Sequence, residues 1–197
     1  MTNGTKHSSP SNLHLALKAR VVDDSETVEE RVFNFTDTIG HVAHQEDFYF
    51  QVSAGQMKLR KTSKDSDIGQ LITSKTLSGN SGSLNLVETQ STEIQEFKNM
   101  RNTLRLCLPE LGHIKKRRRV YVKDNIRINL DDVEQLNATF LDIEIQGSNE
   151  EELLAQAEVV KRELKITDCQ VIGSTYLEMY RKQRATDSGY EDSASDA

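Results

Sequence analysis

Residues 114–133 read IKKRRRVYVKDNIRINLDDV, a basic segment followed by an alternating one, with Asn125 at the turn between them. Alternate side chains of a strand point to opposite faces of a sheet. Lys116 and Arg118 would therefore share one face of the first segment, and Arg127 would share a face with Asp131 in the second. We predict two strands, residues 114–123 and 126–130, each with charged side chains along one face.

The same division into an apolar and a charged face recurs along the chain. In the first predicted strand, residues 12–22, the apolar face contains Leu13, Leu15, Leu17, Ala19 and Val21. The opposite faces of this and two further strands, residues 56–62 and 139–146, carry His14, Ala16, Lys18 and Arg20, then Lys58 and Arg60, then Asp142 and Glu144. Residues 46–52, 70–77 and 170–176 also have strand composition, so eight strands are expected.

Three amphipathic helices are expected between the strands. One is capped at Ser25, a second covers residues 92–108 and ends before Pro109, and a third starts at Ser148 or Asn149. A short basic helix is expected after the last strand. The apolar faces of the strands need a cover, which these helices could supply.

The charged strand faces allow two interpretations. They could be the wet face of an open sheet, which is the usual place for charged side chains. Alternatively, the strands could close into a barrel with a polar interior and helices outside. A ring of inward cations is costly without compensating acids or a bound anion. A polyphosphate would suit it, because guanidinium and ammonium groups both match phosphate oxygens.

Length and composition indicate one domain with polar ends. The chain has 197 residues and a formal net charge of −6, which disfavours general nucleic-acid binding. No apolar run is long enough to span a membrane. Cys107 and Cys169 lack metal-site spacing and are interpreted as small core residues of a cytoplasmic protein. We expect disordered tails at residues 1–11 and 183–197 and a single domain at residues 12–182.

The order of these segments resembles the CYTH superfamily, which includes class IV adenylyl cyclases, thiamine triphosphatases and inorganic triphosphatases. The similarity runs from about Leu13 to Tyr180. The segments that carry it are LKARV at residues 17–21, QEDFYF at 45–50, GQMKLR at 55–60, IKKRRRVY at 114–121, RINLDDV at 127–133 and FLDIE at 140–144.

This resemblance implies an α+β fold, a closed eight-stranded antiparallel β-barrel or triphosphate tunnel with helices packed outside. It also implies a set of site residues. The phosphate-binding side chains would be Lys18, Arg20, Lys58, Arg60, Lys75, Lys116, Arg118 and Arg127. A Mg²⁺ or Mn²⁺ ion would be held by Asp131, Asp142 and Glu144. Lys18 would also be the catalytic cation near the scissile bond, unless it forms a salt bridge with Asp142 or Glu144.

The sequence departs from the family pattern at its acidic positions. His14 and Ala16 replace both glutamates of the Glu-x-Glu-x-Lys signature, Asp142 is one methylene shorter than glutamate, and Asn137 replaces a glycine. Mg²⁺ prefers carboxylate and water oxygens, which Ala16 cannot supply. We therefore expect a protein that binds a triphosphate-containing small molecule but hydrolyses it weakly or not at all.

Two other functions stay open at this point. The chain could be a working hydrolase, a Mg²⁺- or Mn²⁺-dependent triphosphatase or, as second choice, an adenylyl cyclase, that uses the remaining acids. It could also be a scaffold that binds a partner and no ligand. In addition, Ser188 and Ser193 lie in an acidic segment that resembles a phosphorylation-dependent recognition signal. Tyr49 and Tyr176 are interpreted as packing residues, and His14 as a neutral, hydrogen-bonded one.

Overall fold

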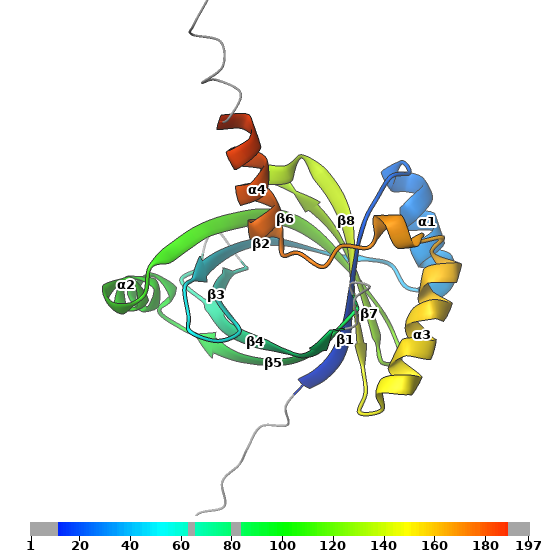
Figure 1. Cartoon of the computed structure of the whole chain (residues 1–197), viewed down its shortest axis with the longest axis horizontal. Coiled ribbons are helices and arrows are strands. Elements are labelled where there is room, and N and C mark those ends of the chain that lie inside the picture. Colours follow the sequence, from blue (N-terminus) through cyan, green and yellow to red (C-terminus); the bar gives the residue numbers. More distant parts are fainter. Residues whose placement is uncertain (1–11, 63–65, 80–83, 189–197) are drawn as a thin grey trace, which may run out of the picture.

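The computed structural model describes residues 12–62, 66–79 and 84–188, and within these ranges eight antiparallel strands close into a ring (Figure 1). The strand order around the ring is β1-β5-β4-β3-β2-β6-β7-β8. Each neighbouring pair is antiparallel, and β1 closes the ring by pairing with both β5 and β8. The predicted eight-stranded antiparallel barrel is confirmed. The predicted tail at residues 1–11 and most of the C-terminal one lie outside the described residues.

The strands are mostly those expected from alternation, with shifted ends. Their bounds are β1 Asn12–Arg20, β2 His41–Phe50, β3 Gln56–Lys61, β4 Gly69–Gly79, β5 Asn85–Ile94, β6 Glu110–Lys123, β7 Ile126–Val133 and β8 Ala138–Gln146.

Four α-helices are described. They are α1 Ser25–Thr36, α2 Phe97–Cys107, α3 Glu150–Glu163 and α4 Tyr176–Ser188. Asp24 and Asn149 cap α1 and α3, because each side chain accepts hydrogen bonds from backbone N–H groups of the first turn. The predicted cap, Ser25, is instead the first residue of the first helix, and Asp24 is its cap.

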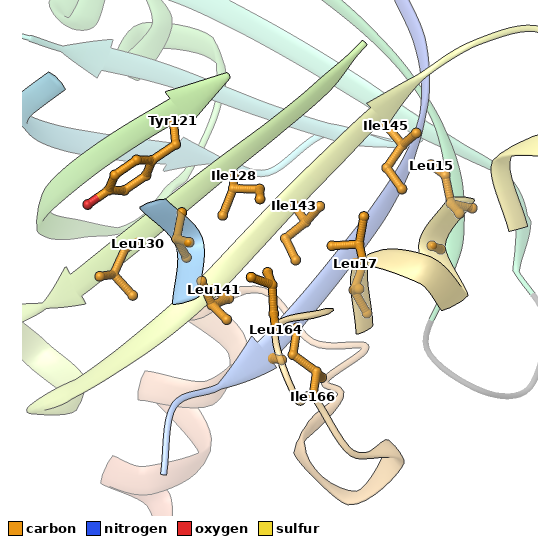
Figure 2. Close-up of a cluster of buried hydrophobic side chains, with 14 of the residues drawn as sticks. Leu15, Leu17, Tyr121, Ile128, Leu130, Leu141, Ile143, Ile145, Leu164 and Ile166 are labelled. Carbon is orange, nitrogen blue, oxygen red and sulfur yellow. The ribbon is translucent and has the colours of Figure 1, made fainter. Parts of the chain in front are cut away.

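The apolar faces of the strands point outward and are covered by helices. Leu15, Leu17 and Ala19 of β1 are buried against a cluster that includes Val32 of α1 and Ala157 of α3. Figure 2 shows side chains of this cluster on β1, β6, β7 and β8, and Figure 1 shows α1 and α3 against this part of the ring. The interior is thus left to the opposite, polar faces, as the barrel interpretation predicts.

Two smaller apolar clusters hold the other helices. Phe97 of α2 packs with Phe48, Phe50 and Leu59 of β2 and β3. Tyr176 and Leu177 at the start of α4 pack with residues of β2, β6, β7 and β8. Helices α1, α2 and α3 therefore cover the outside of the ring. The start of α4 instead packs on inward strand faces, because Ile114 and Phe140 alternate with the same side as Lys116 and Asp142.

The prediction was wrong for two strands. Residues 170–176 were expected to form the last strand, but a 3-10 turn at Asp168–Gln170 is followed by a single bridge between Val171 and Ala19, and α4 begins at Tyr176. The eighth strand is instead β5, which overlaps the predicted helix at residues 92–108. β5 lacks an apolar face, since Glu88 and Gln90 alternate with Thr89 and Ser91.

Two further expectations need correction. Helix α4 continues to Ser188, past residue 183, where the tail was expected to begin. Cys107 and Cys169 are exposed and are not core residues.

A substitution in the outer core tests this inverted polarity. Leu17 is fully buried, so Leu17→Ala should lower the free energy of unfolding by about 2–5 kcal/mol. Val22, just beyond the same strand, is 71% exposed, and Val22→Ala should change it by less than about 0.5 kcal/mol. Urea unfolding followed by circular dichroism measures both. Equal, small effects would contradict the assignment of Leu17 to the core.

Candidate functional site

A cavity of about 980 Å³ lies inside the ring, and most of the predicted site residues line it. They come from β1, β3, β4, β6, β7 and β8, and include Lys18, Lys58, Arg60, Lys75, Lys116, Arg118, Arg127, Asp142 and Glu144. Arg20 is exposed at the end of β1 and is not among the lining residues. Asp131 is fully buried and does not line the cavity itself, but its partners Lys116 and Arg118 do.

Asp47 on β2 anchors one group of cations and was missed by the sequence analysis. Its two carboxylate oxygens accept hydrogen bonds from Arg60 Nε and Nη2 at 2.7 and 2.8 Å. Lys58 Nζ lies 3.2 Å and Lys116 Nζ 3.7 Å from Asp47 Oδ2. Burial opposes ionisation of Asp47, but the three cations outweigh it and hold its pKa well below the usual range.

Asp131 on β7 anchors a second group. Arg118 Nε and Nη2 donate to Asp131 Oδ1 and Oδ2, both at 2.6 Å, and Nη2 also donates to Asp142 Oδ2 at 2.7 Å. Burial opposes ionisation of both carboxyl groups. Nevertheless Arg118 and Lys116 lower the pKa of each, so both are ionised at neutral pH.

Lys116 lies between the two groups. Its Nζ is 3.7 Å from Asp47 Oδ2 and 3.5 Å from Asp131 Oδ2. Burial and the neighbouring Arg118 guanidinium lower the pKa of Lys116 to about 7, although both acids favour its charged form. Lys116 is therefore the cavity cation whose charge responds most readily to an added anion.

Tyr176 belongs to the site and is not only a packing residue. Its hydroxyl donates to Asp131 Oδ2 at 2.9 Å. Its ring lies beneath two ammonium groups, 4.6 Å from Lys18 Nζ and 5.2 Å from Lys116 Nζ. The first residue of α4 thus closes part of the cavity wall, together with the segment Ile172–Thr175. Tyr49 also lines the cavity, with Lys58 Nζ 5.7 Å from its ring centroid.

Three cavity cations form no salt bridge within the described part of the chain: Lys18, Lys75 and Arg127. Lys18 pairs in register with Asp142 across β1 and β8, but its Nζ donates to the carbonyl of Ser174 at 3.4 Å. Arg127 pairs in register with Glu144. These three are the cations with the most capacity to accept a ligand.

The wall carries a surplus of positive charge. Seven lysine and arginine side chains line the cavity, against the three acids Asp142, Glu144 and Glu178. Asp47 and Asp131 add two buried negative charges. The described residues thus leave about two uncompensated positive charges around the cavity, which favours an anionic ligand.

The acids around the cavity do not fit a family-type metal centre. Within the described ranges, Asp131 accepts hydrogen bonds from Arg118 and Tyr176, lies 3.5 Å from Lys116 Nζ and has no exposed surface. Among the described residues, no three His, Cys, Asp or Glu side chains are grouped as metal ligands. Ala16 lies next to Glu144 in register and brings no oxygen. Asp142 and Glu144 alone face the cavity with carboxylates from the predicted metal set.

The sequence contains signals for both Asp47 and Tyr176 as site residues. Asp47 alternates with Gln45 and Tyr49, which places it on the same face as the predicted cavity. Thr175 and Glu178 form reciprocal hydrogen bonds at the start of α4, and this Thr-x-x-Glu pattern signals a helix that begins at Tyr176.

The remaining predicted features lie outside the cavity. Ser188 is the last residue of α4, and Ser193 lies outside the described residues. Within the part of the chain that the structure describes, no helix has the length and hydropathy of a membrane span.

Comparisons with known proteins agree with this geometry. A Pyrococcus horikoshii protein of known structure has 26% identity and a TM-score of 0.73, with 84% of this chain and 98% of that chain covered. A candidate adenylate cyclase of Vibrio parahaemolyticus has 15% identity and a TM-score of 0.68, with 85% and 97% covered. A candidate adenylyl cyclase of Hippeastrum, described as having a dominant triphosphatase activity, has 15% identity and a TM-score of 0.58, with 86% and 97% covered.

No match was found among curated proteins. The family model of the CYTH domain matches residues 15–176, from Leu15 of β1 to Tyr176, which forms part of the cavity wall. Because this match spans most of the sequence and the ring has the expected topology, the chain belongs to the CYTH domain family.

Proposed function

We propose that the cavity binds a triphosphate group and that metal-dependent hydrolysis of this group is weak or absent. The triphosphate would be inorganic or part of a nucleoside or other organic molecule. The observation that carries the proposal is the inward-facing set of seven cations, which exceeds the neighbouring acids by about two charges. Phosphate oxygens are the natural partners of such a set.

The free and the paired cations have different parts in this proposal. Lys18, Lys75 and Arg127 would contact the phosphates directly, because none of them forms a salt bridge with a described carboxylate. The paired cations would attract the ligand electrostatically and would offer it the N–H groups that do not bind Asp47 or Asp131. They are Lys58, Arg60, Lys116 and Arg118. The exposed position of Arg20 gives no support to a phosphate contact there.

We expect weak or absent hydrolysis because few carboxylates around the cavity are free to hold a metal ion. A metal ion would hold phosphate oxygens and offset their charge, but Asp131 is fully engaged and Ala16 has no ligand atom. Lys18, in register with Asp142, is the residue placed to contact a scissile phosphate if hydrolysis occurs. The alternative is a Mg²⁺- or Mn²⁺-dependent triphosphatase. It is favoured by one observation, namely that Asp142 and Glu144 both line the cavity.

Calorimetry with tripolyphosphate in EDTA tests binding. The natural protein should bind with a submillimolar Kd. Lys75→Met and Arg127→Met should each weaken binding about tenfold or more, since each removes a charge-assisted contact of about 1.5 kcal/mol. Lys98→Met, an exposed cation on α2, is the matched control and should bind as the natural protein does. A Kd weaker than millimolar with an unchanged melting temperature would favour the partner-binding scaffold.

Phosphate release separates a binder from an enzyme. With Mg²⁺ or Mn²⁺, the natural protein should release phosphate from tripolyphosphate no faster than the buffer does. The Asp142→Asn, Glu144→Gln double variant should keep or gain tripolyphosphate affinity, because two negative charges facing the ligand are removed. Turnover by the natural protein that disappears in this variant would show that the triphosphatase alternative is correct.

Loss of the Asp47 charge should lower the stability of the protein and strengthen its binding of anions. Asp47→Asn removes the negative charge that pairs with Lys58, Arg60 and Lys116, so the free energy of unfolding should fall by about 3 kcal/mol or more. Tripolyphosphate should raise the melting temperature of this variant more than that of the natural protein. Asp132→Asn, which affects outer ion pairs of Arg117 and Arg119, should cost less than about 1 kcal/mol and leave the ligand shift unchanged.

A further inference from the structure

The guanidinium of Arg118 lies between two carboxylates that come from neighbouring strands. A single nitrogen, Nη2, is 2.6 Å from Asp131 Oδ2 and 2.7 Å from Asp142 Oδ2. We infer that this guanidinium takes the place of a divalent cation, so that the protein carries its own fixed counter-ion and excludes metal from the cavity. The inference concerns the same cavity as the proposed function, but the exclusion of metal ions by Arg118 does not depend on phosphate binding.

The distances support this substitution. Calcium–oxygen bonds are about 2.3–2.6 Å long, and Mg²⁺ bonds about 2.0–2.1 Å. Two carboxylate oxygens of different residues therefore surround one nitrogen at a little more than the calcium–oxygen distance, although well beyond the magnesium–oxygen distance. Two carboxylates this close repel each other strongly unless a cation separates them. The nitrogen supplies that cation.

The position of Arg118 is fixed on both sides. Its Nε and Nη2 bind Asp131 in a bidentate pair, and the residues lie opposite each other in the β6–β7 register. Arg118 is 5% exposed and Asp131 is 0% exposed, so water could hydrate neither charge well if the two groups separated. A metal ion would have to displace a buried charge from both of the carboxylates with which it forms ion pairs.

The site would nevertheless be open to a metal ion if the guanidinium were removed. Asp142 lines the cavity and its side chain is 22% exposed, so an ion could approach from the cavity side. Glu144, two residues along the same strand face, also lines the cavity and offers a further carboxylate. Loss of Arg118 would leave Asp131 and Asp142 close together with one fewer cation, which favours uptake of a divalent ion.

The test measures Mn²⁺ binding to the full chain by electron paramagnetic resonance, with no phosphate present. The natural protein should show no binding at submillimolar Mn²⁺. Arg118→Met should bind one Mn²⁺ at least about tenfold more tightly, and Mn²⁺ should raise its melting temperature. Arg118→Met combined with Asp142→Asn should lose this gain. Arg117→Met is the matched control, because Arg117 is the preceding residue, faces outward and pairs with Asp132.

Two results would overturn the inference. One is submillimolar Mn²⁺ binding by the natural protein that Asp142→Asn abolishes, since the carboxylates would then accept metal with Arg118 in place. The other is a folded Arg118→Met protein whose Mn²⁺ affinity equals that of Arg117→Met. Arg118→Gln, which is uncharged but keeps hydrogen-bond donors, replaces the methionine variant if that variant does not fold. Failure of tripolyphosphate binding would leave these results unaffected.

Discussion

The bidentate ion pairs of Asp47 with Arg60 and of Asp131 with Arg118 make the charged interior of this ring tenable. Each buried ion costs several kcal/mol in lost hydration unless a partner compensates it. Both pairs join neighbouring strands in register, so the same contacts that neutralise the interior also fix the alignment of β2 with β3 and of β6 with β7. With charge inside, the apolar strand faces must turn outward, and α1, α2 and α3 cover them.

The alternating pattern of the sequence identified the two faces of most strands, whereas the choice of a closed ring over an open sheet came from the family resemblance. The pattern failed where alternation carries no information. In β1, leucines alternate with polar residues, and each face is where it was expected. In β5 both faces are polar, so no apolar periodicity marked it as a strand. Residues 170–176 contain enough β-branched and aromatic residues to read as a strand, yet the Thr175–Glu178 capping pair starts a helix there instead.

The cations of the site were predictable, whereas their partners were not. Lys58, Arg60, Lys116 and Arg118 each lie two residues from another cation, which placed them on one strand face from sequence alone. Which acid each would meet depends on the register between strands that are far apart in sequence. Asp47 pairs with two cations from β3 and one from β6, and that arrangement exists only once β2 lies between these strands.

This pairing also limits how much charge the cavity can neutralise by itself. Its surplus of about two positive charges is smaller than the charge of a fully ionised triphosphate. A ligand must therefore weaken some ion pairs or bring protons with it. Lys116 is the group placed to respond, because burial and Arg118 keep its pKa near 7 in the free protein. An added anion favours its charged form and raises that pKa. The surplus of about two counts Lys116 as protonated, so binding near neutral pH would complete that charge by taking up a proton at Lys116.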